Sequence, residues 1–113
     1  MLESVTTTAL ASALTGLSQR QRAIADNIAN VNTSGYVAKV VDFESALRRS
    51  VERGDGEVEA SVRTSTAPTR LNGNNVDLGT ETLANIEAVL RYQFAAQAIG
   101  GTFSSMQTAM RTS

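Results

Sequence analysis

The N-terminal part of the chain carries one narrow apolar stripe with heptad spacing. Its positions alternate at intervals of four and three, with a glutamine in the one place that lacks a large apolar residue: Leu10, Leu14, Leu17, Gln21, Ile24, Ile28 and Val31. This spacing is typical of a helix that packs along another helix. A helix over residues 5–31 would be roughly 40 Å long, which is more than a small globular core needs. The stripe therefore predicts a long helix that requires a long partner.

A second long amphipathic helix is predicted over residues 77–110. Asp77 can cap its first turn, and Glu81 places negative charge near the positive end of the helix dipole. Its large apolar residues recur mostly at intervals of three and four: Leu83, Ile86, Val89, Leu90, Phe94, Ile99, Phe103, Met106 and Met110. Gly100 and Gly101 interrupt this pattern at a cost of about 1 kcal/mol each relative to alanine. We therefore expect either a bend there or the close approach of another backbone.

The residues between the two long helices have a different character. Residues 42–53 have the pattern of a short helix, with Asp42 as its cap and Gly54 just beyond its end. Residues 57–66 alternate apolar and polar side chains, which indicates a short strand. An Asn-Gly pair follows and predicts a turn. We expect residues 54–76 to form exposed connecting structure that includes a hairpin fragment.

These patterns define the expected fold class and domain organisation. The chain should be mainly α, with long N- and C-terminal amphipathic helices packed as a coiled coil or helical bundle and a small irregular middle containing a short helix and short β strands. Its 113 residues allow one structural domain. Within that domain we expect an N-terminal helix and turn over residues 1–35, an irregular middle segment over 36–76, and a C-terminal helix over 77–113.

The composition argues against catalysis and cofactor binding. The chain has no cysteine, histidine or tryptophan, so disulfides, thiol nucleophiles, imidazole bases and the usual zinc ligands are absent. Pairs such as Asp26 with Asn27 are better explained as solvated helix residues than as acid and base partners. Ten basic residues against 11 acidic ones create no field that favours nucleic acid. We expect no enzymatic activity, catalytic or metal-binding residue, cofactor, small-molecule substrate or nucleic-acid partner.

The N-terminal segment does not fit the pattern of a signal peptide. Glu3 stands where a positive region should be, and Arg20 and Arg22 follow where a small-residue cleavage site is expected. No apolar run approaches the roughly 18 to 20 residues of a membrane span. We expect a soluble chain without a cleaved signal.

The first helix stops at a dense cluster of turn-forming residues. Asn30 and Asn32 tolerate turn conformations and can bond local backbone groups, so they end the helix where the apolar stripe ends. Residues 33–36 suit a type II turn in which Gly35 supplies the positive φ. The aromatic ring and polar tip of Tyr36 suit a contact with a neighbouring subunit. The candidate residues of this turn motif are Asn27, Asn30, Asn32, Thr33, Ser34, Gly35 and Tyr36.

Residues 25–36, ADNIANVNTSGY, resemble the N-terminal signature of the bacterial flagellar axial proteins, the rod and hook family, which reads close to N-N-I/L-A-N-x-x-T-P-G-Y. Residues 41–44, 73–78 and 90–93 (VDFE, GNNVDL and LRYQ) look similar to the FlgB-type proximal rod subunits within that family. Ser34 stands where the family usually has proline, which loosens the turn.

The resemblance implies a structural subunit of the flagellar basal-body rod. Such a subunit transmits torque by self- and hetero-assembly through its terminal helices, and it reaches the periplasmic rod from the cytoplasm through the flagellar type III export system without a cleaved signal peptide. The implied partners are copies of itself, other rod proteins, the small rod-base adaptor, and proteins of the membrane ring and export gate.

We assign the assembly seam to the large apolar residues of the two predicted long helices. On the first helix these are Leu10, Leu14, Leu17, Ile24, Ile28 and Val31, and opposite them on the second are Ile86, Val89, Leu90, Phe94 and Phe103. The same residues could also form the core of an intramolecular hairpin. A stand-alone cytoplasmic coiled-coil adaptor is the alternative function, but it leaves the asparagine-rich helix stop unexplained.

Overall fold

Two long helices and a small middle segment make up the structure. The computed structural model describes residues 2–112, with side chains from Val5 to Arg111, so the predicted segment ends Met1 and Ser113 lie outside the described residues. The elements in chain order are α1 (Leu2–Ala29), β1 (Lys39–Asp42), α2 (Glu44–Glu52), β2 (Ser61–Thr64) and α3 (Leu78–Thr112). The prediction of a mainly α fold with two long terminal helices is confirmed.

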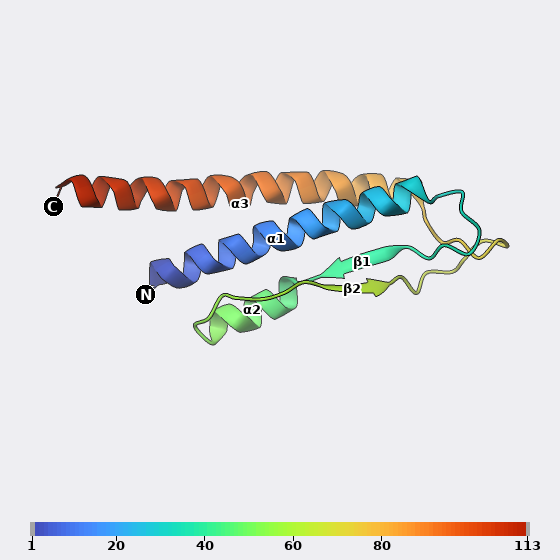
Figure 1. The fold of residues 1–113 in the computed structure, drawn as a ribbon, viewed down its shortest axis with the longest axis horizontal. Coiled ribbons are helices and arrows are strands. Elements are labelled where there is room, and N and C mark those ends of the chain that lie inside the picture. The colour runs from blue at the N-terminus through green and yellow to red at the C-terminus, as the bar shows by residue number, and fades with distance from the viewer. Residues whose placement is uncertain (1, 113) are drawn as a thin grey trace.

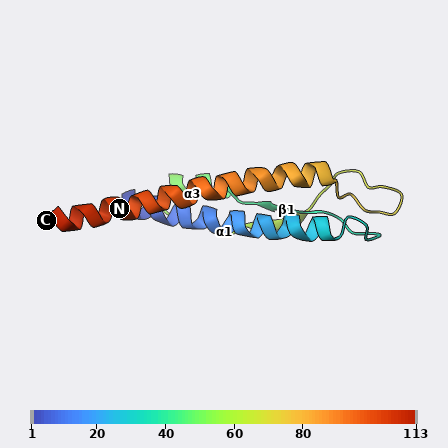
Figure 2. The same cartoon turned by 90° about the horizontal axis from the view of Figure 1, so that it is seen from above.

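Helix α1 lies in the middle of an elongated, thin molecule. The molecule measures 66 × 25 × 14 Å along its principal axes. Helix α3 runs antiparallel along one side of α1, and β1, β2 and α2 lie along its other side (Figure 1). The view from above also places α1 and α3 side by side, with the C-terminal end of α3 reaching beyond α1 (Figure 2). Both sides of α1 are therefore covered by other parts of the chain.

The apolar core lies between α1 and the middle segment. Leu17 and Ala23 of α1 pack with Val41 and Phe43 in one buried cluster. Gly16 makes this packing possible, because a Cβ atom at that position would lie only 2.6 Å from Cδ1 of the Phe43 ring. A glycine in the middle of a helix lowers its stability, but here it lets an aromatic ring contact the helix backbone.

The two strands pair with each other although α2 lies between them in the sequence. Strands β1 and β2 are antiparallel, with Val41 opposite Val62 and Asp42 opposite Ser61. The expected hairpin fragment within residues 54–76 was therefore wrong, since β2 pairs with residues 39–42. Strand β2 is also shorter than the predicted 57–66. Its partner β1 has only four residues, because α2 begins at Glu44, shortly after β1 ends. The short partner limits the length of β2.

Helix α2 begins without the predicted side-chain cap. Phe43 occupies its N-cap position and makes no capping hydrogen bond with its side chain. Asp42, the predicted cap, is instead the last residue of β1, and its Oδ2 accepts a hydrogen bond from Nε of Arg63 at 2.6 Å. The pair lies diagonally across the strands on one face, where opposite charges attract. Sheet pairing thus removes Asp42 from the helix end.

Helix α3 begins as predicted. Oδ1 of Asp77 accepts hydrogen bonds from the backbone N–H groups of Gly79, at 2.9 Å, and Thr80, at 3.5 Å. The helix then continues to Thr112 as one straight element (Figure 1). A Cβ atom built at Gly100 or Gly101 would meet nothing within 4 Å, so the expected bend or close approach of another backbone was wrong for the isolated chain. Within the described part of the chain, no helix combines the length and apolar character needed to span a membrane.

Candidate assembly site

The predicted N-terminal seam lies on α1, at the centre of the molecule. Leu17 and Ile24 are buried, whereas Leu10, Leu14 and Val31 are half-buried. Ile28, near the end of α1, has a relative exposure of 38%. Much of this stripe is thus covered within one chain. Its role in contacts between subunits stays a prediction.

The predicted C-terminal seam lies mostly on the outside of α3. Val89 is half-buried, but Ile86, Leu90, Phe94 and Phe103 are exposed. Among its described side chains, the buried ones are spaced seven residues apart along α3: Glu81, Ala88 and Ala95. Within the described chain, two alanines of α3 are therefore buried, whereas most of its large apolar residues are exposed.

The exposed apolar residues form a row along α3, which we call the outer stripe: Leu83, Ile86, Leu90 and Phe94. Intervals of three and four residues place them on one face of the helix, and at 100° per residue that face lies opposite Ala88 and Ala95. Their relative exposures range from 51% to 75%. A row of exposed apolar side chains is typical of an interaction site. The outer stripe is our candidate assembly site.

A buried asparagine holds the elements around this site in place. Asn27 of α1 is completely inaccessible to solvent. Its Nδ2 donates to the Lys39 carbonyl at 2.9 Å and to Oε1 of Glu81 at 3.1 Å. Its Oδ1 accepts from the Tyr36 hydroxyl and the Lys39 N–H, both at 2.9 Å. One amide thus connects α1, the following turn, β1 and α3, and its two donors and both oxygen lone pairs are used.

A second buried asparagine closes the C-terminal end of α1. Nδ2 of Asn74 donates to the carbonyls of Asn30 and Thr33, each at 2.8 Å. Its Oδ1 accepts from the Val76 N–H at 2.7 Å and from the Arg70 guanidinium at 2.9 Å. Carbonyls at a helix end lack partners within the helix, and Asn74 supplies one.

The turn after α1 has the conformation that residues 33–36 predict. Gly35 has a φ of 76°, and the Tyr36 N–H donates to the Thr33 carbonyl at 3.3 Å. Asn32 and Ser34 are exposed on its surface. The Tyr36 hydroxyl points back into its own chain, toward Asn27, rather than outward. The turn motif residues thus gather where the end of α1 meets the start of α3, which we call the corner. Their role in assembly stays a prediction.

Glu81 is the buried charge at this corner. It is 8% exposed, one turn into α3, with its carboxylate against the Asn27 amide. Burial raises the pKa of Glu81, the hydrogen bond from Asn27 opposes that rise, and the nearby charge of Asp77 adds to it. The carboxylate sits near the positive end of the α3 dipole, which favours negative charge. Glu81 therefore ties the start of α3 to α1.

Three charged residues join the three helices farther along. Arg20 of α1 donates to the Glu44 carboxylate at 2.5 and 2.7 Å, and Arg91 of α3 reaches the same carboxylate at 3.0 Å. The hydrogen bonds from Arg20 lower the pKa of Glu44 to about 2. Arg20 also lies 4.9 Å from the centroid of the Phe43 ring. Glu44 thus fixes α3 against α1 while the outer stripe of α3 faces away.

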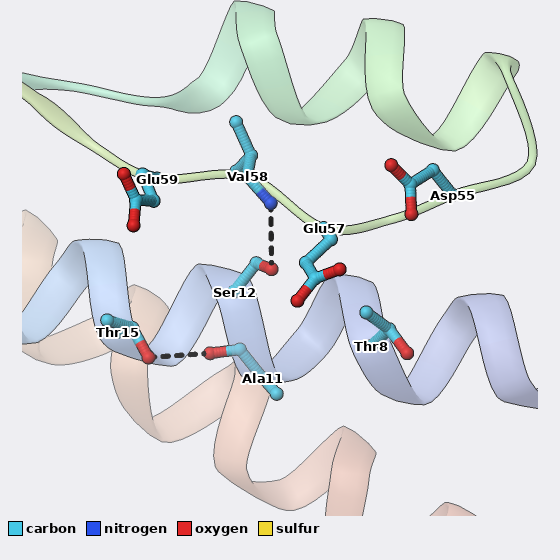
Figure 3. A pocket seen from close by; sticks show the side chains of 8 residues that line it. All are labelled: Thr8, Ala11, Ser12, Thr15, Asp55, Glu57, Val58 and Glu59. Atoms are coloured by element: carbon cyan, nitrogen blue, oxygen red, sulfur yellow. Dashed lines mark hydrogen bonds between the residues drawn. The ribbon is translucent and has the colours of Figure 1, made fainter.

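A surface cavity lies between α1 and the middle segment. Its volume is about 530 Å³, and hydroxyl residues of α1 face an acidic segment across it (Figure 3). Ser12 spans the two sides, because its Oγ donates to the Gly56 carbonyl at 3.0 Å and accepts from the Val58 N–H at 3.3 Å. Asp55, Glu57 and Glu59 are exposed. This arrangement fastens the middle segment to α1.

The sequence pattern missed the residues that organise the site. It marks Asn74 only as part of a family-like segment and Glu81 only as a favourable helix charge, and it does not reveal the Arg20–Glu44–Arg91 group. A basic residue on the buried side of an apolar helix, as Arg20 is, could have signalled an internal partner. The small residues Ala88 and Ala95, spaced by seven, could have signalled the inward face of α3.

The geometry defines a class of protein: an elongated structural subunit with a covered helix face and a free apolar face. The family model described as "Flagella basal body rod protein" matches residues 8–36, which include most of α1 and the turn. The matched segment thus coincides with the central helix and the corner. This match points to the class of flagellar basal body rod proteins.

Individual relatives make this assignment more specific. The flagellar basal body rod protein FlgB of Escherichia coli K12 is 32% identical, over 83% of this chain and 84% of the relative. FlgB of Bacillus subtilis strain 168 is 30% identical, over 89% of each chain. FlgB of Cereibacter sphaeroides is 30% identical, over 81% of this chain and 83% of the relative. The chain belongs to the FlgB family of flagellar basal body rod proteins and is a structural component of the flagellar rod.

Proposed function

We propose that the chain assembles into the rod through its terminal helices, with copies of itself and with other rod proteins. The observation that carries this proposal is the outer stripe of α3, whose four large apolar side chains are 51% to 75% exposed while the opposite face is packed on α1. Because these side chains are already partly covered, burying the rest of them is worth roughly 4 to 7 kcal/mol before the cost of association. Burial of the outer stripe therefore favours association with a neighbouring subunit.

The assembled subunits transmit torque. A shaft needs torsional stiffness, and interdigitated helices supply it because close-packed interfaces resist shear. The described structure supports this role through Glu44 and Asn27, which fix α1 and α3 to each other and to the middle segment. A subunit held internally in this way can pass force from one neighbour to the next.

We further propose the route and the partners that the family suggests. The subunit leaves the cytoplasm through the flagellar type III system without a cleaved signal and takes its place in the periplasmic part of the rod. It contacts the rod-base adaptor and proteins of the membrane ring and export gate. The likeness to FlgB basal body rod proteins supports the place of the subunit in the rod.

The test replaces single seam residues in the native gene. Phe94→Asp places a charge in the outer stripe, and Ile28→Asp does the same in the exposed part of the α1 stripe. Both should abolish rods, seen by electron microscopy of basal bodies, and motility in soft agar. Purified Phe94→Asp chain should keep its circular dichroism spectrum, since Phe94 is exposed in the isolated chain.

The matched control is Asn85→Asp, which adds the same charge at an exposed polar position on another face of α3. It should leave rods and motility intact, which separates the outer stripe from a general effect of charge on α3. Normal motility with Phe94→Asp would refute the outer stripe as an assembly site, and normal motility with Ile28→Asp would refute the α1 seam.

A further inference from the structure

Leu71 is the most exposed large apolar residue among those described. It lies in the turn of residues 70–73 with a relative exposure of 110%, so nothing in its own chain covers it. The Gly73 N–H donates to the Arg70 carbonyl at 2.9 Å, and the Arg70 N–H donates to the Asn74 carbonyl at 2.8 Å. The fold thus presents a leucine to solvent on a turn closed by hydrogen bonds.

This turn is fixed to the rest of the molecule. The Arg70 guanidinium donates to the carbonyls of Val76, at 2.7 Å, and Val31, at 2.9 Å. The Asn72 carbonyl accepts from the Gly35 N–H at 2.8 Å, which joins this turn to the turn after α1. A side chain on a backbone fixed in this way loses less conformational freedom when it binds. Leu71 is therefore preorganised for a contact.

Gly100 and Gly101 are a second feature that the isolated chain does not explain. Glycine is the least favourable helix residue after proline, yet two lie side by side within α3. A Cβ atom at either position would meet nothing within 4 Å, so packing inside the chain does not require glycine there. We call these two glycines the notch. Gly101 follows Phe94 by seven residues, so the notch continues the face of the outer stripe.

We propose that Leu71 of one copy of this chain inserts into the notch of the next copy in the rod. This inference rests on the proposed function and names one contact within it. The segment between β2 and α3, which carries Leu71, forms one end of the long axis, whereas the notch lies in the half of α3 toward the opposite end (Figure 1). A contact between two different surfaces of the same chain repeats along an axis without closing.

The size of the contact argues for a neighbour within the assembly as the occupant. One leucine in a notch buries far less than the roughly 1,000 Å² that a specific stable complex needs. It can act only between subunits that other surfaces, such as the adjoining outer stripe, already hold together. Because this chain carries both the projecting leucine and the notch, successive copies use both parts at once.

The first experiment uses cysteine cross-linking, since the natural chain contains no cysteine. Leu71→Cys and Ser104→Cys, the latter one turn from Gly101, are expressed together as separate chains and oxidised in isolated basal bodies. A disulfide-linked dimer should form only when both are present. The pair of Leu71→Cys with Arg22→Cys, an exposed position on α1, is the control and should form none.

A second experiment fills the notch. Gly101→Leu should leave the purified chain equally or more helical, because the added side chain meets open space and favours helix. The same substitution, and separately Leu71→Ser, should weaken association of copies by about tenfold or more, the worth of burying a leucine. Fewer rods should then be recovered at low expression.

The outcomes separate this inference from the proposed function. If Phe94→Asp abolishes rods while Gly101→Leu and Leu71→Ser leave them normal and the cysteine pair does not cross-link, the notch contact is wrong and the assembly role stands. Cross-linking of Leu71→Cys to a different rod protein would overturn the second copy as occupant. If Phe94→Asp is also harmless, the proposed function fails as well.

Discussion

At the residue scale, two fully buried asparagines hold the corner of the molecule together. The side chains of Asn27 and Asn74 together bond groups of both long helices and of the segments between them. Removing either amide would leave buried backbone groups without partners, at about 1 to 3 kcal/mol for each group. The stability of the corner therefore depends on the identity of these two asparagines more strictly than an apolar core depends on any one of its side chains.

The turn gives a prediction with opposite signs at adjacent residues. Gly35→Val should destabilise the purified chain by about 1 to 3 kcal/mol, because its φ of 76° strains any β-branched residue. Ser34→Pro should be neutral or stabilise by up to about 1 kcal/mol, since proline presets the second turn position. Urea unfolding followed by circular dichroism measures both. Equal tolerance of the two changes would refute the type II turn.

Glu44 makes stability depend on acid pH. Its pKa is about 2 in the folded chain against an ordinary 4.5, so the folded state favours the charged form. Its contribution is fully present above pH 4.5 and is lost as pH falls toward 2. We expect a loss of about 1 kcal/mol over this interval, because the half-exposed carboxylate is screened by water.

The variant Glu44→Gln should flatten that part of the curve of unfolding free energy against pH. Glu81 acts in the opposite direction: its raised pKa means that falling pH relieves the cost of its burial, starting above 4.5. Glu81→Gln is therefore the matched control and should keep the loss between pH 4.5 and 2. The assignment to Glu44 fails if Glu44→Gln retains the full acid loss.

At the scale of elements, local patterns predict more than long-range pairing does. Heptad spacing and Asp77 are local features, and they gave the two long helices and the start of α3. Strands β1 and β2 are separated in the sequence by α2, so a local alternation of residues cannot show that they pair. The burial of Asn27 likewise requires α3, from which it is far in sequence.

Periodicity also left open which face of α3 turns inward. The pattern marks both a row of large residues and a series of small ones, and the large row was assigned opposite the α1 stripe. In the structure Ala88 and Ala95 are buried in that place. Small residues let two helices approach closely, so they suit a contact within the thin molecule. The large residues remain available for neighbours.

The contact of Phe43 with α1 can be tested at Gly16. Gly16→Leu should destabilise the chain by about 2 kcal/mol or more, because its Cβ alone would lie 2.6 Å from the Phe43 ring. Thermal unfolding of the purified variant measures the loss. Combining it with Phe43→Ala should cost less than the sum of the two changes, since the smaller residue leaves room. Strict additivity would contradict the contact.

At the scale of the whole molecule, the fold divides its apolar surface between two uses. The buried cluster around Phe43 and the small face of α3 hold one chain together, and the outer stripe is left exposed along a molecule 66 Å long. An elongated subunit with a free apolar helix face suits a continuous assembly. This division accounts for a chain in the FlgB family that buries so few of the large residues of α3.

We expect neighbouring subunits to cover the outer stripe in the rod. Gln97→Cys introduces a single thiol on the same face of α3, between Phe94 and the notch, in a chain without other cysteines. Maleimide labelling compares purified chain, isolated basal bodies, and basal bodies after dissociation. We expect rapid labelling of the free and dissociated chains, and labelling that is at least about tenfold slower in intact rods. Equal rates in intact rods and free chain would contradict it.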